Sequence, residues 1–336
     1  MAGSLEIETS GQTFKVSSPD KIYFPEDGIT KREVVEYFVA VEDGIMRALR
    51  DRPTTMHRFP EGTKGEGFYY KRIAGKAPSW VQGVDVLFPA AGPGTMLCPQ
   101  DLAHVLWAVN QGAFELHPWP VTRADLIHPT EMRIDFDPHE GAPIEKIPDV
   151  AFAVREFLAE VDLEAFPKLS GHRGIHLHVP IAPRWSFTEV RNAAVALARE
   201  MARRLPDLVT CEWWKELRGP RIFIDFNQNL RDKTLAAAYA VRPYPGAPVA
   251  CPITWDEVRT ADSRDFTVRT VPARFKAIGD PMAAFAAATP GPIEDLLARF
   301  QHDVDAGVPD SPWPPHYPKQ EGELPRVAPS RAKKPD

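Results

Sequence analysis

Two acidic residues in the stretch EMRIDFDPHE have the spacing that metal-dependent chemistry requires. Asp135 and Asp137 alternate with Ile134 and Phe136. This is the period of a half-buried strand, so both carboxylates should lie on the face opposite the apolar pair. Pro138 lacks a backbone donor and ends the strand. Taken alone, the pair is weak evidence, because solvated strand faces that carry two acids are much commoner than metal sites. The interpretation therefore depends on later stretches with the same pattern.

Two later strands repeat the alternation of apolar and chemically active residues. His176 and His178 alternate with apolar residues in IHLHVP, and Asp225 is on the polar side of RIFIDF. If the three strands are neighbours in one sheet, three carboxylates and an imidazole converge. Such crowded carboxylates repel one another unless cations neutralise them, and oxygen ligands suit Mg²⁺ or Mn²⁺. We therefore predict a two-ion site for phosphoryl or nucleotidyl transfer, with Asp135, Asp137 and Asp225 as metal ligands and catalytic residues.

A glycine-bracketed turn, SGHRG at residues 170–174, lies between these strands. Its glycines let the backbone approach an anion, and the Ser170 hydroxyl, the Arg173 guanidinium and the turn amides can donate to phosphate. A hairpin turn that merely needs glycine is the alternative. Together with the acids, the turn favours a triphosphate as substrate.

The N-terminal part of the chain should present a basic, aromatic surface. Thr30 and Glu33 form a capping box that begins a helix with an apolar stripe as far as Leu49. Residues 47–76 contain eight Lys or Arg against three acids, and they include the aromatic run FYY at residues 68–70. Basic side chains interleaved with aromatics suit stacking on a nucleic-acid strand. An ordinary strand with cross-strand aromatic pairs beside a solvated face is the alternative.

The composition sets limits on the class of protein. The chain has 336 residues, 43% of them hydrophobic, and a net charge of −6, so any nucleic-acid surface must be a local patch. Three distant cysteines and no apolar run of membrane-spanning length predict a cytoplasmic protein with no membrane partner. From Asp305 onward the chain is polar and rich in proline, which predicts a disordered or partner-binding tail.

The order DFD, SGHRGIH and IFID resembles the three motifs of the archaeo-eukaryotic primase (AEP) superfamily. It is most similar to the polymerase domain of ligase D from bacterial non-homologous end joining. The resemblance runs from about residue 16 (VSSPDKIYFPEDGITK) through AFELHPW to KTLAAAYAVRP, and more loosely to about residue 300. No ligase or phosphoesterase motif accompanies it, so the chain resembles the stand-alone mycobacterial relatives of the Prim-PolC type.

The resemblance implies an α/β (α+β) fold. An RRM-like antiparallel catalytic sheet with flanking helices would be joined to an N-terminal α/β module. We predict a single primase-polymerase domain at residues 1–304, made of a module at 1–115 and a core at 116–304, followed by the tail at 305–336.

The resemblance also implies roles for individual residues. The set expected to bind the nucleotide comprises His117, Ser170, Arg173, His176, Arg218, Lys233 and Arg242. The set expected to bind DNA comprises Lys21, Lys31, Arg58, Phe68, Tyr69 and Lys71. Within it, Phe68 and Tyr69 would stack at the template fork, and Lys21 and Lys31 would receive a downstream 5′-phosphate. Lys31 lies in the first turn after the Thr30 cap, where free backbone amides and the helix dipole favour an anion, and Lys21 lies in a loop that could fold back beside it. One departure is that His172 and Arg173 stand where ligase D domains usually have a small residue and Lys.

The function predicted on this basis is template-directed extension of a primer 3′-OH across short gaps or broken DNA ends, with ribonucleotides favoured. The substrates would be gapped or broken duplex DNA with a 5′-phosphate and NTPs or dNTPs, with Mn²⁺ or Mg²⁺ as two-ion cofactor. The partners would be an ATP-dependent DNA ligase and Ku. The alternatives are a two-metal nuclease and a non-catalytic scaffold that binds DNA ends.

Overall fold

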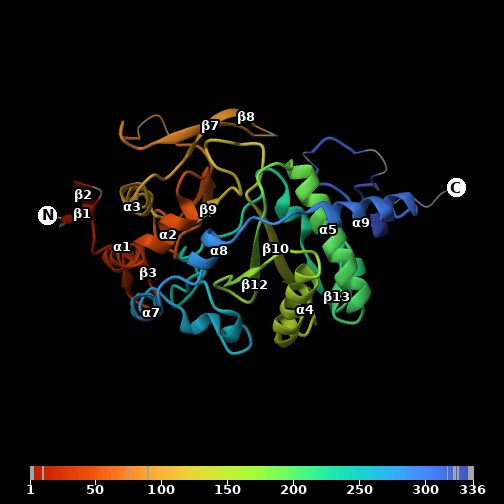
Figure 1. The fold of residues 1–336 in the computed structure, drawn as a ribbon. Helices are drawn as coiled ribbons and strands as arrows, with labels where there is room; N and C mark the ends of the chain where they lie inside the picture. The colour runs from red at the N-terminus through yellow and green to blue at the C-terminus, as the bar shows by residue number, and fades with distance from the viewer. Residues whose placement is uncertain are drawn as a thin grey trace.

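The computed structural model describes residues 4–9, 11–73, 75, 77–88, 91–315, 317–320, 323 and 325–331. Within them the chain forms two larger sheets and two small hairpins (Figure 1). The N-terminal elements are β1 (Ser4–Thr9), β2 (Gln12–Ser17), β3 (Ile22–Phe24), β4 (Ile29–Thr30), α1 (Lys31–Ala40), α2 (Glu42–Leu49), β5 (Thr54–Arg58), β6 (Phe68–Tyr70), β7 (Gly83–Phe88), β8 (Gly92–Leu97), α3 (Leu102–Asn110) and β9 (Ala113–Pro118).

The elements that follow build the second sheet and its helices. They are β10 (Glu131–Pro138), the 3₁₀ helix η1 (Ile144–Lys146), α4 (Ile147–Ala159), β11 (Phe166–Leu169), β12 (Ile175–Pro180), α5 (Phe187–Arg204), β13 (Val209–Thr210), α6 (Lys215–Arg218), β14 (Ile222–Ile224) and η2 (Phe226–Asn229). The C-terminal part contains η3 (Trp255–Glu257), η4 (Ser263–Asp265), α7 (Val271–Ile278), α8 (Ala283–Ala287), α9 (Glu294–Asp305) and η5 (Pro329–Arg331).

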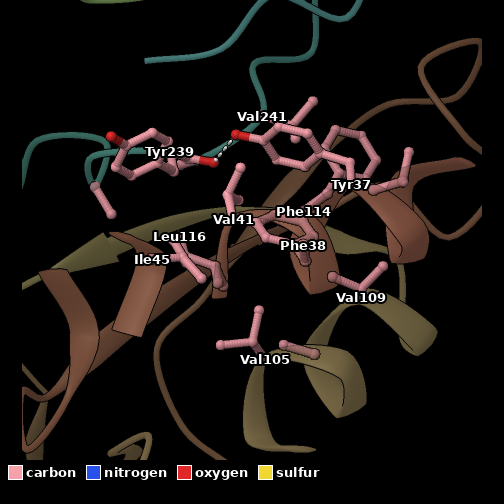
Figure 2. Close-up of a cluster of buried hydrophobic side chains, with 14 of the residues drawn as sticks. Tyr37, Phe38, Val41, Ile45, Val105, Val109, Phe114, Leu116, Tyr239 and Val241 are labelled. Atoms are coloured by element: carbon pink, nitrogen blue, oxygen red, sulfur yellow. Dashed lines mark hydrogen bonds between the residues drawn. The ribbon is translucent and has the colours of Figure 1, made fainter. Parts of the chain in front are cut away.

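The first sheet has the order β6-β5-β8-β7, with β9 paired to β5, and its core lies against the first helices. Figure 2 shows Phe38 and Val41 packed with Phe114 of β9. The buried Tyr37 hydroxyl donates a 2.8 Å hydrogen bond to the carbonyl oxygen of Tyr239, so its polar atom is satisfied (Figure 2). Residues from 236 to 251 thus pack into the same core as residues more than 200 positions earlier in the chain.

The capping box of Thr30 and Glu33 is present, as predicted. The helix predicted to reach Leu49 is instead two helices, because α1 ends at Ala40 and α2 begins at Glu42. The apolar stripe continues across the break, since the side chains on both sides of it are buried in one core.

The second sheet has the order β11-β12-β10-β14-β13 and is antiparallel except for the β13–β14 pair. α4 and α5 pack with one face of it, which buries Ile134, Phe136 and Leu177 (Figure 1). α5 begins with a capping box of Ser186 and Glu189. The prediction of mixed helices and antiparallel sheets is confirmed, and the polar face of the second sheet is left to carry chemistry.

The division of the chain at residue 115 stays a prediction. That position lies inside β9, which pairs with β5, so the first sheet continues past it. None of the helices within the described residues is long and apolar enough to span a membrane.

In the tail predicted to be disordered or partner-binding, several of the described residues pack on the rest of the chain. Trp313 is 4% exposed and lies 4.5 Å from the Arg191 guanidinium. Arg191 is itself buried and pairs with Asp310 at 2.6 Å, because a buried guanidinium needs a charged partner. The Tyr317 hydroxyl donates to the carbonyl oxygen of Arg231. Residues 332–336, which end the tail, lie outside the described residues.

Candidate active site

The three strands that carry the predicted metal ligands are neighbours. β10 lies between β12 and β14, with Asp135 opposite His176 and Asp137 opposite Phe223. Asp225 directly follows β14, and its amide donates to the carbonyl oxygen of Asp135 at 3.0 Å. The alternation in the sequence therefore brings all three carboxylates to the polar face of one sheet.

Burial and mutual repulsion shift the pKa values of these carboxylates. Burial, followed by the charges of Asp225 and Asp137, raises the pKa of Asp135 to about 7. Burial also raises the pKa of Asp225, although Lys233 and Arg218 oppose this shift. A divalent cation would favour the ionised forms of both groups.

The described residues do not form a ready-made set of three His, Cys, Asp or Glu metal ligands. Asp137 is turned towards Arg218, with a 3.0 Å contact between Oδ2 and Nη1. The Asp225 side chain accepts a 3.0 Å hydrogen bond from the Asn227 amide and caps η2. The donor chemistry fits Mg²⁺ or Mn²⁺, because all three groups are carboxylates. Binding would require Asp137 to exchange Arg218 for the cation.

The SGHRG turn is closed by its own serine. The Ser170 hydroxyl accepts from the amides of His172 at 3.2 Å and Gly174 at 3.1 Å. Gly171 has a φ of +71°, and a Cβ there would lie 2.5 Å from Cγ of Arg242 and 3.0 Å from a backbone nitrogen. Arg173 is exposed. The turn thus needs glycine for its shape, as expected for an ordinary hairpin turn. It also presents Arg173 beside the carboxylates.

A cavity of about 460 Å³ joins the carboxylates to this turn. The predicted site residues that line it are His117, Asp135, Asp137, Ser170, Arg173, His176 and Arg242. Both ring nitrogens of His117 are buried without a hydrogen-bond partner among the described residues. His117 Nε2 nevertheless has a charged neighbour, because it lies 3.3 Å from Glu115 Oε1.

Three predicted residues, Arg218, Lys233 and Asp225, are not part of the cavity lining. Arg218 is reached through its contact with Asp137, and Lys233 lies in the loop after η2. Arg218 and Lys233 both lie close enough to Asp225 for their charges to act on its carboxylate.

The predicted aromatic surface is present on β6. Phe68 and Tyr69 are 46% and 58% exposed. Tyr69 stacks on His57 of β5 with ring centroids 4.2 Å apart, and the Arg58 guanidinium lies 5.6 Å from the Phe68 ring. Lys71 lies 3.8 Å from an Asp232 oxygen, and Lys76 lies outside the described residues. Cross-strand pairing accounts for these ring contacts, and the exposed faces remain open to a stacking partner.

The environment of Lys21 and Lys31 differs from the one that motivated their prediction. The loop does fold back, because the Lys31 amide donates to the Lys21 carbonyl at 2.8 Å. The first amides of α1 are not free, however, since Arg32 donates to the Pro19 carbonyl at 2.8 Å. The Lys31 ammonium is buried and donates to the Ser17 carbonyl at 2.7 Å. Burial, aided by the charge of Lys21, lowers the pKa of Lys31 to about 8. The 5′-phosphate pocket remains a prediction.

Two buried charged residues beside the cavity were not predicted. Lys168 on β11 is 0% exposed, and its Nζ lies 3.0 Å from His176 Nδ1. Glu115 on β9 is 2% exposed and lies 2.5 Å from His57 Nδ1. Glu115 and His117 are two positions apart on one strand, so the period of two could have indicated that they share a face. Nothing in the sequence indicates how deeply either residue is buried.

Comparisons with known proteins identify the family of the chain. A profile of the family described as "LigD, primase-polymerase domain" matches residues 30–282. The "Multifunctional non-homologous end joining protein LigD" of Mycolicibacterium smegmatis is 31% identical over 307 residues, covering 91% of this chain and 40% of that protein. The "Bifunctional non-homologous end joining protein LigD" of Bacillus subtilis is 30% identical, covering 86% of this chain and 46% of that protein.

A solved structure has the same fold. The "Polymerase Domain from Mycobacterium tuberculosis Ligase D in complex with DNA" superposes with a TM-score of 0.76 at 28% identity, covering 82% of this chain and 98% of that one. The fold is therefore that of primase-polymerases, as predicted. The chain belongs to the LigD primase-polymerase domain family. It spans less than half the length of these two LigD relatives.

Proposed function

We propose that this protein is a metal-dependent nucleotidyltransferase that extends a primer 3′-OH across short gaps or broken ends under the direction of a DNA template. The observation that carries the proposal is the cavity in which Asp135 and Asp137 meet the SGHRG turn and His117. The names of the LigD relatives and the DNA-bound structural neighbour support a role in end joining.

Asp135, Asp137 and Asp225 would hold two Mn²⁺ or Mg²⁺ ions, which supply activation of the attacking oxygen and stabilisation of the leaving oxygen. The protein's own part is to bind and orient the triphosphate. Arg173 and the turn amides would donate to phosphate oxygens, and His117 has unpaired ring nitrogens for the same purpose.

His176 would complete the triphosphate site from the floor of the cavity. Its Nε2 lies 3.4 Å from Asp135 Oδ1, which places the imidazole between the carboxylates and the turn. Arg218, Lys233 and Arg242 would supply positive charge around the nucleotide and primer. Lys21, Lys31, Arg58, Phe68, Tyr69 and Lys71 would contact DNA. The family resemblance adds four points to this proposal. The protein would prefer ribonucleotides and act at the nucleoid, and its partners would be Ku and a ligase that seals the product.

The test is incubation of a labelled gapped duplex with Mn²⁺ and either NTPs or dNTPs. The proposal predicts that the wild-type chain elongates the primer. It also predicts that Asp225→Asn lowers the elongation rate by at least about 10³-fold. Shortening of the labelled strand would instead support a two-metal nuclease, and retention without any change in length would support a DNA-end scaffold. The ratio of NTP to dNTP incorporation measures the sugar preference directly.

A further inference from the structure

One buried carboxylate, Glu115, lies between the aromatic surface and the nucleotide cavity. Its Oε2 accepts a 2.5 Å hydrogen bond from His57 Nδ1, on the side of the aromatic surface. Its Oε1 lies 3.3 Å from His117 Nε2 and 3.0 Å from Arg242 Nε, both of which line the cavity. These two contacts lack good hydrogen-bond geometry, so their contribution is mainly electrostatic. Each oxygen of Glu115 thus faces a different functional surface.

The same two imidazoles hold the exposed ring of Tyr69. His57 stacks on Tyr69 with an interplanar angle of 12°, and His117 meets the ring edge-to-face at 5.7 Å and 76°. Any movement of Tyr69 towards or away from a stacked base therefore acts on two groups that contact Glu115.

Arg242 extends this connection to the SGHRG turn. Its side chain packs on Gly171 so closely that a Cβ there would lie 2.5 Å from Cγ of Arg242. The Arg242 guanidinium also lies 5.7 Å from the ring of Tyr244, which stacks on His172 of the turn at 4.4 Å. A triphosphate that draws Arg242 or His117 into new contacts must change their contacts with Glu115.

We propose that Glu115 is a positioning residue that couples the stacking of a template base on Tyr69 to the binding of a nucleoside triphosphate in the cavity. This inference rests on the proposed function. A base on Tyr69 would fix His57 and His117 against Glu115, and the nucleotide would then meet a site that is already ordered. Because binding linkage is reciprocal, the nucleotide would increase the affinity for the templated duplex by the same factor.

The experiment measures the dissociation constant of a non-hydrolysable ATP analogue with Mn²⁺ in the absence and presence of a gapped duplex with thymine as the templating base. The ratio of the two constants is the coupling, for which we expect about 5- to 150-fold in the wild-type chain. A duplex with an abasic templating position should reduce this ratio to near one. Two variants test the residues: Glu115→Gln removes the charge, and His57→Phe keeps a ring beneath Tyr69 without the hydrogen bond. Both should bring the coupling below about twofold.

Glu131→Gln is the matched control. Glu131 is also a buried carboxylate that contacts a histidine and an arginine, at 2.7 Å to His178 and 2.6 Å to Arg133. Neither of these partners lines the nucleotide cavity, whereas His117 and Arg242, the partners of Glu115, do. The coupling ratio of Glu131→Gln should equal that of the wild type, with thermal unfolding as the check on folding. If Glu115→Gln does not fold, the coupling ratio of His57→Phe tests the inference instead. The His57 side chain is less buried than that of Glu115, so its replacement should disturb the fold less.

A wild-type ratio near one, or an unchanged ratio in His57→Phe, overturns the inference. Failure of the proposed function is a separate result, because it appears as no elongation of the gapped duplex by the wild-type chain. A chain that elongates the duplex without coupling would keep the proposed function and lose only the role of Glu115.

Discussion

Replacing Lys168 by methionine should weaken nucleotide binding while leaving the fold intact. The Lys168 ammonium donates to the Ala236 carbonyl at 2.9 Å and faces His176 Nδ1 at 3.0 Å. An ammonium can only donate, so Nδ1 must accept, and this places the imidazole proton on Nε2. Nε2 is the nitrogen near Asp135, on the side of the cavity. Methionine has a similar volume and cannot make the hydrogen bond that fixes this tautomer.

The expected magnitude follows from the loss of one charge-assisted hydrogen bond. Such a bond contributes about 1.5 to 3 kcal/mol, so the nucleotide KM should rise by roughly 10- to 150-fold if the orientation of His176 depends on it. The melting temperature should change little. Burial, with Arg242 and Arg133 adding to it, lowers the pKa of Lys168 to about 7, so the folded state gains little from this charge. Apolar replacement of a buried charge is often neutral or stabilising.

The assay combines steady-state kinetics with ¹⁵N-edited NMR of the histidine rings at pH 6. Burial, followed by the charge of Lys168, holds the pKa of His176 well below its usual range, so the ring is neutral at this pH. Lys146→Met is the matched control, because Lys146 is exposed and pairs with Asp149. A wild-type His176 with its proton on Nδ1 would refute the reasoning. So would a Lys168→Met variant with an unchanged tautomer and an unchanged KM.

Three further outcomes are expected. Arg173→Ala should raise the nucleotide KM by roughly 10- to 150-fold, the loss of about 1.5 to 3 kcal/mol, with DNA affinity retained; weaker DNA affinity with an unchanged KM would place Arg173 in the DNA surface. The Lys21→Ala, Lys31→Ala double variant should lose the wild-type preference for a gapped duplex with a downstream 5′-phosphate, measured by binding at physiological salt; equal wild-type binding of phosphorylated and hydroxyl ends would exclude the pocket. Asp135 keeps its proton up to about pH 7 in the metal-free fold, against about pH 4 when unfolded, so the free energy of unfolding should fall as the pH rises between these values. Mn²⁺ should stabilise the protein more at the upper end of this interval than at its lower end. Thermal unfolding of Asp135→Asn should show a smaller fall with pH and a smaller effect of Mn²⁺, with the remainder due to Asp225, whose pKa is also raised.

The sequence could predict the faces of the strands but not their neighbours. Alternation placed Asp135, His176 and Asp225 on polar faces, because the two-residue period of a strand is local. The pairing of β10 with β12 and β14 depends on contacts between segments that are distant in the sequence. Without the family resemblance, the alternation alone could not predict that these three strands are neighbours. The capping boxes were predictable because both of their partners lie within four positions of each other.

The environment of the N-terminal lysines shows the opposite case. The sequence indicates that Lys31 begins a helix, and the first amides of a helix are usually unpaired. Here the Lys21 and Pro19 carbonyls accept from them, because the short β3–β4 hairpin folds back onto α1. The capping pattern predicted the start of the helix correctly. The expectation that its first amides are unpaired was wrong, because their acceptors come from a separate segment of the chain.

The unpaired polar atoms give an independent reason to place a bound anion in the cavity. Removing charged and polar groups from water is unfavourable unless each finds a partner. Lys168 and Glu131 meet this requirement within the protein, through His176 and Arg133 respectively. His117 Nε2 and Arg242 Nε have only the Glu115 carboxylate, at 3.3 and 3.0 Å and without hydrogen-bond geometry, and His117 Nδ1 has no hydrogen bond among the described residues. Unlike His178 and Arg52, each of which also has a buried nitrogen without a hydrogen bond to the described residues, these two side chains line the cavity beside the SGHRG turn, so phosphate oxygens of a bound nucleotide would complete them there.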